Sequence, residues 1–284
     1  MEDTLIKDVS DTARWIAMYR AQETERPDAV FKDVLARKLA GEKGAQIAAA
    51  VPHTDLMAFA MVARTTAIDQ LVLSALALGA DTVINLGAGL DTRPYRMKLP
   101  EDLRWIEVDF AHMIEFKNRM LEFDRPVCRL ERIACDLTRE AEREKLFQQL
   151  GSATKSALII TEGVIGYLTN AQAEDLSHSL FKIPSFKFWI QDYSQGKRRS
   201  NRHTKKIAQM LKSAPLQFNV EDPIRFFTQH GWKVTENIFI LDEADRLGRS
   251  MPIMFPWTIL MALFPKKIRA MANKTYGYVL LGKP

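Results

Sequence analysis

Residues that could bind a nucleotide-like ligand follow four apolar runs of this 284-residue chain. The run at 82–86 leads into Gly87 and Gly89, where glycine would let the main chain turn tightly and approach a ligand closely. The next three runs end on the carboxylates Asp109, Asp136 and Glu162. Since open α/β sheets bind ligands at the carboxyl ends of their strands, we expect the glycine turn and the three acids to form one site.

The spacing within the glycine turn indicates which kind of nucleotide would bind. A dinucleotide-binding fingerprint has Gly or Ala three positions after its second glycine, and this chain has Thr92 there. The turn therefore fits a pyrophosphate poorly and fits S-adenosylmethionine, with its adenosine and amino-acid tail, better. Asp109 is expected to accept hydrogen bonds from the ribose hydroxyls, and capping a helix predicted over 111–123 is the alternative role.

A specific sequence block surrounds the turn, Asn85-Leu-Gly-Ala-Gly-Leu-Asp-Thr-Arg93. Further blocks follow the expected order at 12–21, 62–65, 107–109, 136–137 and 162–168. Together they resemble the leucine carboxyl methyltransferase family of S-adenosylmethionine-dependent O-methyltransferases, including its bacterial polyketide-type branch. The resemblance covers about the first 195 residues and is weaker beyond them, where substrate specificity usually resides.

The resemblance implies roles for residues around the cofactor. The turn Gly87-Ala88-Gly89 would approach the methionine part, and Phe110, next to Asp109, would also bind the cofactor. Asp136 and Leu137 would bind the edge and the face of the adenine. Capping of the next helix is the alternative role for Asp136.

Charged residues complete the site that the resemblance implies. Arg64 would clamp the cofactor carboxylate with its forked guanidinium, and Arg14, or a neighbour within 12–14, would add a second cation. Glu162 would face the cofactor ammonium. The alternatives are an exposed helix arginine for Arg64 and a structural salt bridge for Glu162. Arg93 and Tyr167 are the candidates on the substrate side.

The hydrophobic pattern predicts an α/β fold with strands and helices in alternation. Helices are expected at 12–21, 29–39 and 64–78, before the first strand, and later at 111–123, 140–150, 171–181, 200–212 and 222–230. Five strands from 82 to 193 and two late strands at 233–240 and 276–281 give a Rossmann-like, seven-stranded, mostly parallel sheet. The resemblance implies that the two late strands form the end of a class I methyltransferase sheet. We expect one domain over 1–284, with a helical cap layer at 1–80, a cofactor-binding core at 81–195 and a substrate-side segment at 196–284.

Composition agrees with a folded enzyme that binds no metal. The hydrophobic content of 47% suffices for one sizeable core. The two cysteines are expected to be reduced residues of a cytoplasmic protein, and no secretory signal is evident. The five histidines show no metal-ligand spacing on one helix face, so no metal site is expected.

Two later stretches have unusual composition. Residues 196–206 include six basic residues, which form either a solvated helix face or a surface that attracts an acidic partner. No aromatic residues alternate with these cations, which disfavours nucleic-acid binding. Residues 251–264 are apolar but too short to span a bilayer. They are expected to form a lid on an apolar pocket, with a weak membrane-surface contact or a dimer patch as alternatives.

The absence of an evident catalytic base favours one class of methyl acceptor. A carboxylate is already ionised at neutral pH, whereas a phenol or alcohol must lose a proton. The sequence therefore predicts transfer of a methyl group to a small, partly apolar carboxylic acid or polyketide-like metabolite, with S-adenosylhomocysteine as the product. The alternatives are a phenol or alcohol O-methyltransferase, a protein carboxyl methyltransferase and a non-catalytic cofactor-binding protein. Neither the oligomeric state nor the acceptor itself follows from the sequence.

Overall fold

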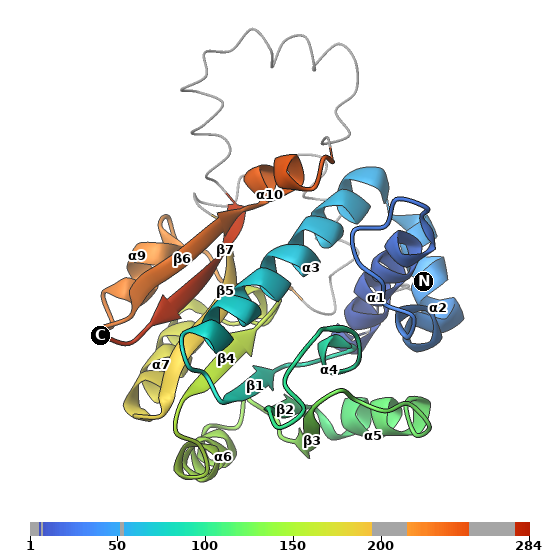
Figure 1. Cartoon of the computed structure of the whole chain (residues 1–284). Helices are drawn as coiled ribbons and strands as arrows, with labels where there is room; N and C mark the ends of the chain where they lie inside the picture. Colours follow the sequence, from blue (N-terminus) through green and yellow to red (C-terminus); the bar gives the residue numbers. More distant parts are fainter. Residues whose placement is uncertain (1–5, 7, 52–53, 195–214, 250–275) are drawn as a thin grey trace, which may run out of the picture.

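The structure is a computed structural model that describes residues 6, 8–51, 54–194, 215–249 and 276–284 (Figure 1). Its helices are α1 (Val9–Glu25), α2 (Ala36–Ala50), α3 (Thr54–Ala77), α4 (Arg93–Arg96), α5 (Ala111–Met120), α6 (Glu140–Ser152), the 3-10 helix η1 (Ile165–Tyr167), α7 (Asn170–Lys182), α9 (Pro223–Thr228) and α10 (Ile240–Arg246). Its strands are β1 (Thr82–Leu86), β2 (Arg104–Asp109), β3 (Arg129–Ala134), β4 (Ala157–Thr161), β5 (Phe186–Ser194), β6 (Lys233–Phe239) and β7 (Tyr276–Gly282).

The seven described strands form one sheet in the order β3-β2-β1-β4-β5-β7-β6. β1 to β5 pair in parallel, and β7 runs antiparallel between β5 and β6. The predicted seven-stranded, mostly parallel α/β sheet is therefore confirmed. Strand order reverses between β1 and β4, which is the switch point where such sheets open a crevice for a ligand.

Helices cover both faces of the sheet because its central strands are apolar on both sides. All five residues of β1 and of β4 are buried. In β1, Ile84 packs into the cluster formed with α6, α7 and α9, and Val83 packs into the opposite cluster with α3. This alternation fixes the register, since successive side chains point to opposite faces of a strand.

The helical layer before β1 is confirmed and has a small core of its own. Buried residues of α1, α2 and α3 pack together with Leu90 and with Met113 of α5. Residues Met57–Ala77 of α3 are long and apolar enough to cross a membrane by length and composition, but 56% of the most apolar window is buried inside the protein. Figure 1 shows α3 running across one face of the sheet, as expected of a core helix.

The helix predicted at 29–39 is wrong in position, since α2 begins only at Ala36. Side chains of α1 take the backbone donors that a helix would use in the preceding segment. Glu23 accepts a hydrogen bond from the N–H of Val30 at 2.8 Å, and Thr24 accepts one from the N–H of Asp33 at 2.8 Å. Such side-chain bonds compete with helix formation. The helix predicted at 200–212 and the apolar stretch 251–264 lie outside the described residues.

Candidate functional site

A cavity of about 500 Å³ lies at the carboxyl ends of the parallel strands, beneath α1 and α3. Its wall contains the glycine turn after β1, the ends of β2 and β4, and η1. Of the residues proposed from the sequence, ten line it: Arg64, Gly87, Ala88, Gly89, Arg93, Asp109, Phe110, Leu137, Glu162 and Tyr167. Its volume lies within the range of small-molecule sites.

The glycine turn has the backbone that only glycine adopts without strain. Gly87 has a φ of +70° and Gly89 a φ of +48°. A Cβ on Gly87 would lie 2.5 Å from Cγ2 of Val164, a cavity-lining residue in the loop after β4. The turn therefore needs glycine both for its conformation and for the space beside it. Thr92, which replaces the third small residue of a dinucleotide fingerprint, is fully buried and donates a hydrogen bond to Asp33 at 2.6 Å.

Asp109 closes the turn from the neighbouring strand. One carboxylate oxygen accepts the N–H of Gly89 at 2.6 Å, and the other accepts the N–H of Phe110 at 2.7 Å. Burial raises the pKa of Asp109, although these two N–H groups act in the opposite direction. The alternative role as a helix cap is not observed, because α5 has Phe110 at its N-cap and no side-chain cap bond.

Arg64, Glu162 and Arg93 form a charged network at the opposite wall. Glu162 accepts a hydrogen bond from Nε of Arg64 at 2.6 Å and one from Nη1 of Arg93 at 2.7 Å. Nη2 of Arg64 packs on Gly163, where a Cβ would lie 2.7 Å away. Within the described part of the chain, only Nε of Arg64 has a hydrogen-bond acceptor, so its two terminal nitrogens can bind an anionic ligand.

The electrostatics of this wall keep its carboxylates ionised. Burial alone would raise the pKa of Glu162, but Arg93 and Arg64 lower it overall. Burial alone would also raise the pKa of Asp91. The charges of Arg93, Lys117 and Arg96 outweigh this effect, so the pKa of Asp91 is lowered overall. Desolvation of the Arg64 guanidinium would lower its pKa, but the charges of Glu162 and Asp192 raise it overall.

The two candidates on the substrate side differ in their surroundings. Arg93 is almost fully buried and pairs with Asp69 at 2.7 Å, Asp91 at 3.0 Å and Glu162 at 2.7 Å. Its guanidinium is thus bound by protein carboxylates. This arrangement suits a residue that positions Glu162. The hydroxyl of Tyr167 has no hydrogen-bond partner among the described residues, and this side chain lines the cavity.

Two predicted cofactor residues do not line the cavity. Arg14 of α1 donates a hydrogen bond to the carbonyl of Leu39 at 3.4 Å and stacks over the ring of Phe116, so its guanidinium is directed between α2 and α5. The carboxylate of Asp136 accepts the backbone N–H and the hydroxyl of Thr138. It closes a turn there and does not cap α6, which begins at Glu140.

Sequence reasoning missed most of the apolar wall. Its residues come from the helical layer, the turn after β1, α5, the end of η1 and the segment before α9: Trp15, Ile16, Met57, Met61, Leu90, Met113, Leu168 and Leu216. Met57 and Met61 are four residues apart on α3, and Arg64 follows Met61 by about one turn. This helical spacing was the signal that could have placed both methionines beside Arg64. Leu216 lies in a loop, and no such spacing signal pointed to it. Asn85, whose amide donates to Asp91 at 2.8 Å, was likewise not predicted to take part in the site.

Comparisons with known protein sequences point to one family. The family described as leucine carboxyl methyltransferase matches residues 13–180. A Streptomyces coelicolor protein, named as a candidate S-adenosyl-L-methionine-dependent methyltransferase, is 37% identical over 177 residues, which cover 57% of this chain and 61% of that relative. A relative from Streptomyces avermitilis with the same kind of name is 33% identical and is also covered to 61%. A Mycobacteroides abscessus relative is 27% identical, with coverage of 87% of this chain and 90% of the relative.

Comparisons with solved structures concern the fold. A DUF574 family protein from Streptomyces avermitilis has a TM-score of 0.60 at 11% identity, covering 96% of this chain and 97% of its own. A protein from Thermobifida fusca, described as a candidate methyltransferase, has a TM-score of 0.56 at 12% identity, with coverage of 99% and 96%. At these identities the two structures show a shared fold.

Proposed function

Because this chain belongs to the leucine carboxyl methyltransferase family, we propose that it is an S-adenosylmethionine-dependent methyltransferase that acts on a carboxylate oxygen of a small, partly apolar acid. The matches to the two Streptomyces relatives span less than two thirds of those proteins, so the activity is inferred from the site of this chain. A location in the cytoplasm is part of the same proposal.

The residues present fit the cofactor. The buried carboxylate of Asp109 can accept hydrogen bonds from ribose hydroxyls, and the glycine turn leaves space for a ligand beside the main chain. Across the cavity, the terminal nitrogens of Arg64 can bind a carboxylate, and Glu162 can accept a hydrogen bond from an ammonium. The bound cofactor would supply a methyl group on a positively charged sulfur.

One observation carries the choice of a carboxylate acceptor. Among the described residues that line the cavity there is neither histidine nor lysine. The three carboxylates of the lining, Asp91, Asp109 and Glu162, each already accept hydrogen bonds from protein donors. A hydroxyl acceptor would need a base to remove its proton, whereas a carboxylate is ionised at neutral pH.

The reaction then needs only alignment and exclusion of water. The acceptor oxygen would bond to the methyl carbon as the carbon–sulfur bond broke, with its electron pair left on sulfur, so no protein group would have to accept a proton. The apolar wall would remove water from the acceptor carboxylate and hold the apolar part of the acid. The hydroxyl of Tyr167 can donate a hydrogen bond to an acceptor oxygen and orient it.

The proposal is tested by calorimetry followed by an acceptor screen. We expect S-adenosylmethionine and S-adenosylhomocysteine to bind saturably and NAD not to bind. The screen supplies radiolabelled methyl donor with carboxylic acids, phenols and alcohols. A labelled product that mild base hydrolyses is a carboxyl ester, whereas a base-stable product would be a phenol or alcohol ether and would contradict the carboxylate assignment. Binding without turnover of any acceptor would contradict enzymatic activity.

A further inference from the structure

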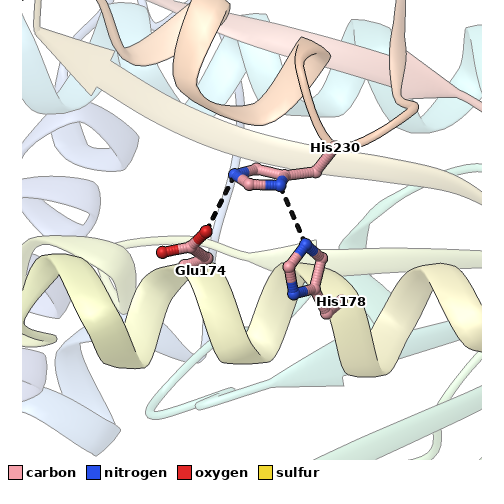
Figure 2. A group of neighbouring side chains, drawn as sticks. All are labelled: Glu174, His178 and His230. Atoms are coloured by element: carbon pink, nitrogen blue, oxygen red, sulfur yellow. Dashed lines mark hydrogen bonds and ion pairs between the residues drawn. The ribbon is translucent and has the colours of Figure 1, made fainter.

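Three potential metal ligands meet on the surface of the protein, away from the residues that line the cavity. Glu174 and His178 lie four residues apart on α7, and His230 lies two residues after α9 (Figure 2). One ligand atom from each side chain can be chosen so that all three lie within 4.8 Å of one another. We propose that these residues bind a divalent transition-metal ion of the zinc type.

The geometry of the cluster is close to what such an ion needs. Nε2 of His178 lies 2.8 Å from Nδ1 of His230, and Nε2 of His230 lies 3.5 Å from the Glu174 carboxylate. Two nitrogens on one tetrahedral zinc ion are about 3.4 Å apart, since each Zn–N bond is about 2.05 Å. Only one ring nitrogen of His230 can bind the ion, and the chosen ligand atoms lie within 4.8 Å of one another, so the separations must close by at most about 1.4 Å, which side-chain rotation can supply.

Contacts within the protein position the two histidines beside each other. Residues at i and i+4 of a helix share one face, so α7 presents Glu174 and His178 side by side. The ring of His230 packs edge-on against His178 at 4.5 Å and against Phe226 at 5.6 Å. Its backbone is fixed by a hydrogen bond from its N–H to the carbonyl of Phe227 at 3.1 Å. These contacts restrict His230 before binding, which lowers the conformational entropy that binding would cost.

The chemistry of the donors selects the ion. Two imidazoles and one carboxylate suit zinc and its first-row neighbours, whereas Mg²⁺ and Ca²⁺ prefer an all-oxygen shell. The His178 side chain is exposed, which leaves the fourth position open to water. Asp175, the neighbouring acid on α7, already pairs with Arg143 at 2.5 Å and is not needed as a ligand.

A bound ion would tie together two segments that both form the cavity wall. α7 contributes Gln172, and the segment before α9 contributes Leu216 and Gln217. The segment already attaches to η1, because the N–H of Gln217 donates to the carbonyl of Gly166 at 2.8 Å. Asn219 is also bonded to Asn170 at the start of α7. The ion would strengthen the contact between His178 and His230, which are 52 positions apart, and would stabilise the folded state.

The test is a titration of the tag-free 284-residue chain with ZnCl2 after treatment with EDTA. We expect one Zn²⁺ per chain and no binding of Mg²⁺. In His178→Ala and His230→Gln the affinity should fall at least tenfold, with a smaller loss in Glu174→Gln. The matched control is His112→Ala, because His112 bonds to Ser10 and lies outside the cluster, and its affinity should be unchanged.

A second readout is the melting temperature. At free Zn²⁺ about 100-fold above the dissociation constant, the wild-type protein should melt about 5 °C higher, and His178→Ala should show no increase. Circular dichroism checks that each variant is folded. The proposal is overturned if Zn²⁺ does not bind, or if the affinity stays the same in both His178→Ala and His230→Gln, since other ligands would then hold the ion.

Discussion

Arg64 of α3 and Glu162 after β4 are 98 residues apart in the chain, and their side chains meet at 2.6 Å in the cavity wall. The same carboxylate also binds Arg93, which follows the glycine turn after β1. One partly buried acid thus joins the helical layer to two strand ends at the switch point of the sheet. The ion pair that fixes the site is therefore also a connection on which the fold depends.

Replacing Glu162 by Gln should destabilise the protein in a pH-dependent manner. A carboxylate whose pKa is lower in the folded than in the unfolded state stabilises the fold above its ordinary pKa of 4.5, and this stabilisation is lost as the pH falls through the folded value. We expect the variant to lose about 3 kcal/mol of unfolding free energy near neutral pH, because Arg64 would lose its charged partner and Arg93 one of its three carboxylate partners. Below about pH 4.5 the difference from wild type should shrink.

Urea unfolding at a series of pH values measures this effect. The control is Glu142→Gln, since Glu142 forms an exposed pair with Arg139 and should cost no more than about 0.5 kcal/mol. A loss in Glu162→Gln that stays constant down to pH 3 would show that the charge of Glu162 is not what stabilises this wall.

Asp109→Asn should weaken binding of S-adenosylhomocysteine. The amide can accept with one oxygen only, whereas the carboxylate accepts from Gly89 and Phe110 and retains lone pairs for a ribose. A loss of about 1–3 kcal/mol, or roughly 5- to 150-fold in the dissociation constant, is expected from calorimetry. Asp136→Asn is the matched control, because this acid follows the neighbouring strand but does not line the cavity. Equal losses in the two variants would contradict the placement of the ribose at Asp109.

Gly87→Ala should abolish cofactor binding and also destabilise the fold. The new methyl group would overlap Cγ2 of Val164 and would need a positive φ. Gly79→Ala separates the two causes, because Gly79 also has a positive φ, of +95°, but has open space around its Cβ position. We expect Gly79→Ala to cost about 1–2 kcal/mol of stability with unchanged affinity for S-adenosylhomocysteine. Binding by Gly87→Ala with wild-type affinity would refute the role of this turn as the cofactor cradle.

The sequence was sufficient for the sheet and for one side of the site. The runs at 82–86 and 157–161 are apolar throughout, which is typical of parallel strands covered on both faces, and both are fully buried. Residues that directly follow such parallel strands all lie at the same edge of the sheet. Gly87, Asp109 and Glu162 could therefore be assigned to one sheet edge from the order of the strands alone, and all three line the cavity.

Side-chain partners could not be predicted from local sequence. Arg14 donates to the carbonyl of Leu39 near the kink that Gly41 makes in α2, and the packing of α1 on α2 is set by the helical layer as a whole. His178 and His230 meet although 52 residues separate them, and their spacing matches no local metal-ligand pattern. In both cases the deciding contact is long-range, so periodicity and local spacing contained no information about it.

Tyr167→Phe should lower the catalytic efficiency without changing cofactor affinity. Tyr167 lines the cavity and its hydroxyl has no hydrogen-bond partner among the described residues, so a bound acceptor can provide one. A hydrogen bond to a carboxylate contributes about 1.5–3 kcal/mol, and its loss should lower kcat/KM by roughly 10- to 150-fold. Tyr95→Phe is the control, since the hydroxyl of Tyr95 accepts from Arg132 at 2.6 Å outside the cavity, and it should change stability only. If Tyr167→Phe instead weakened S-adenosylhomocysteine binding with kcat/KM at saturating cofactor unchanged, Tyr167 would belong to the cofactor side, and the acceptor would have to be positioned by other residues of the apolar wall.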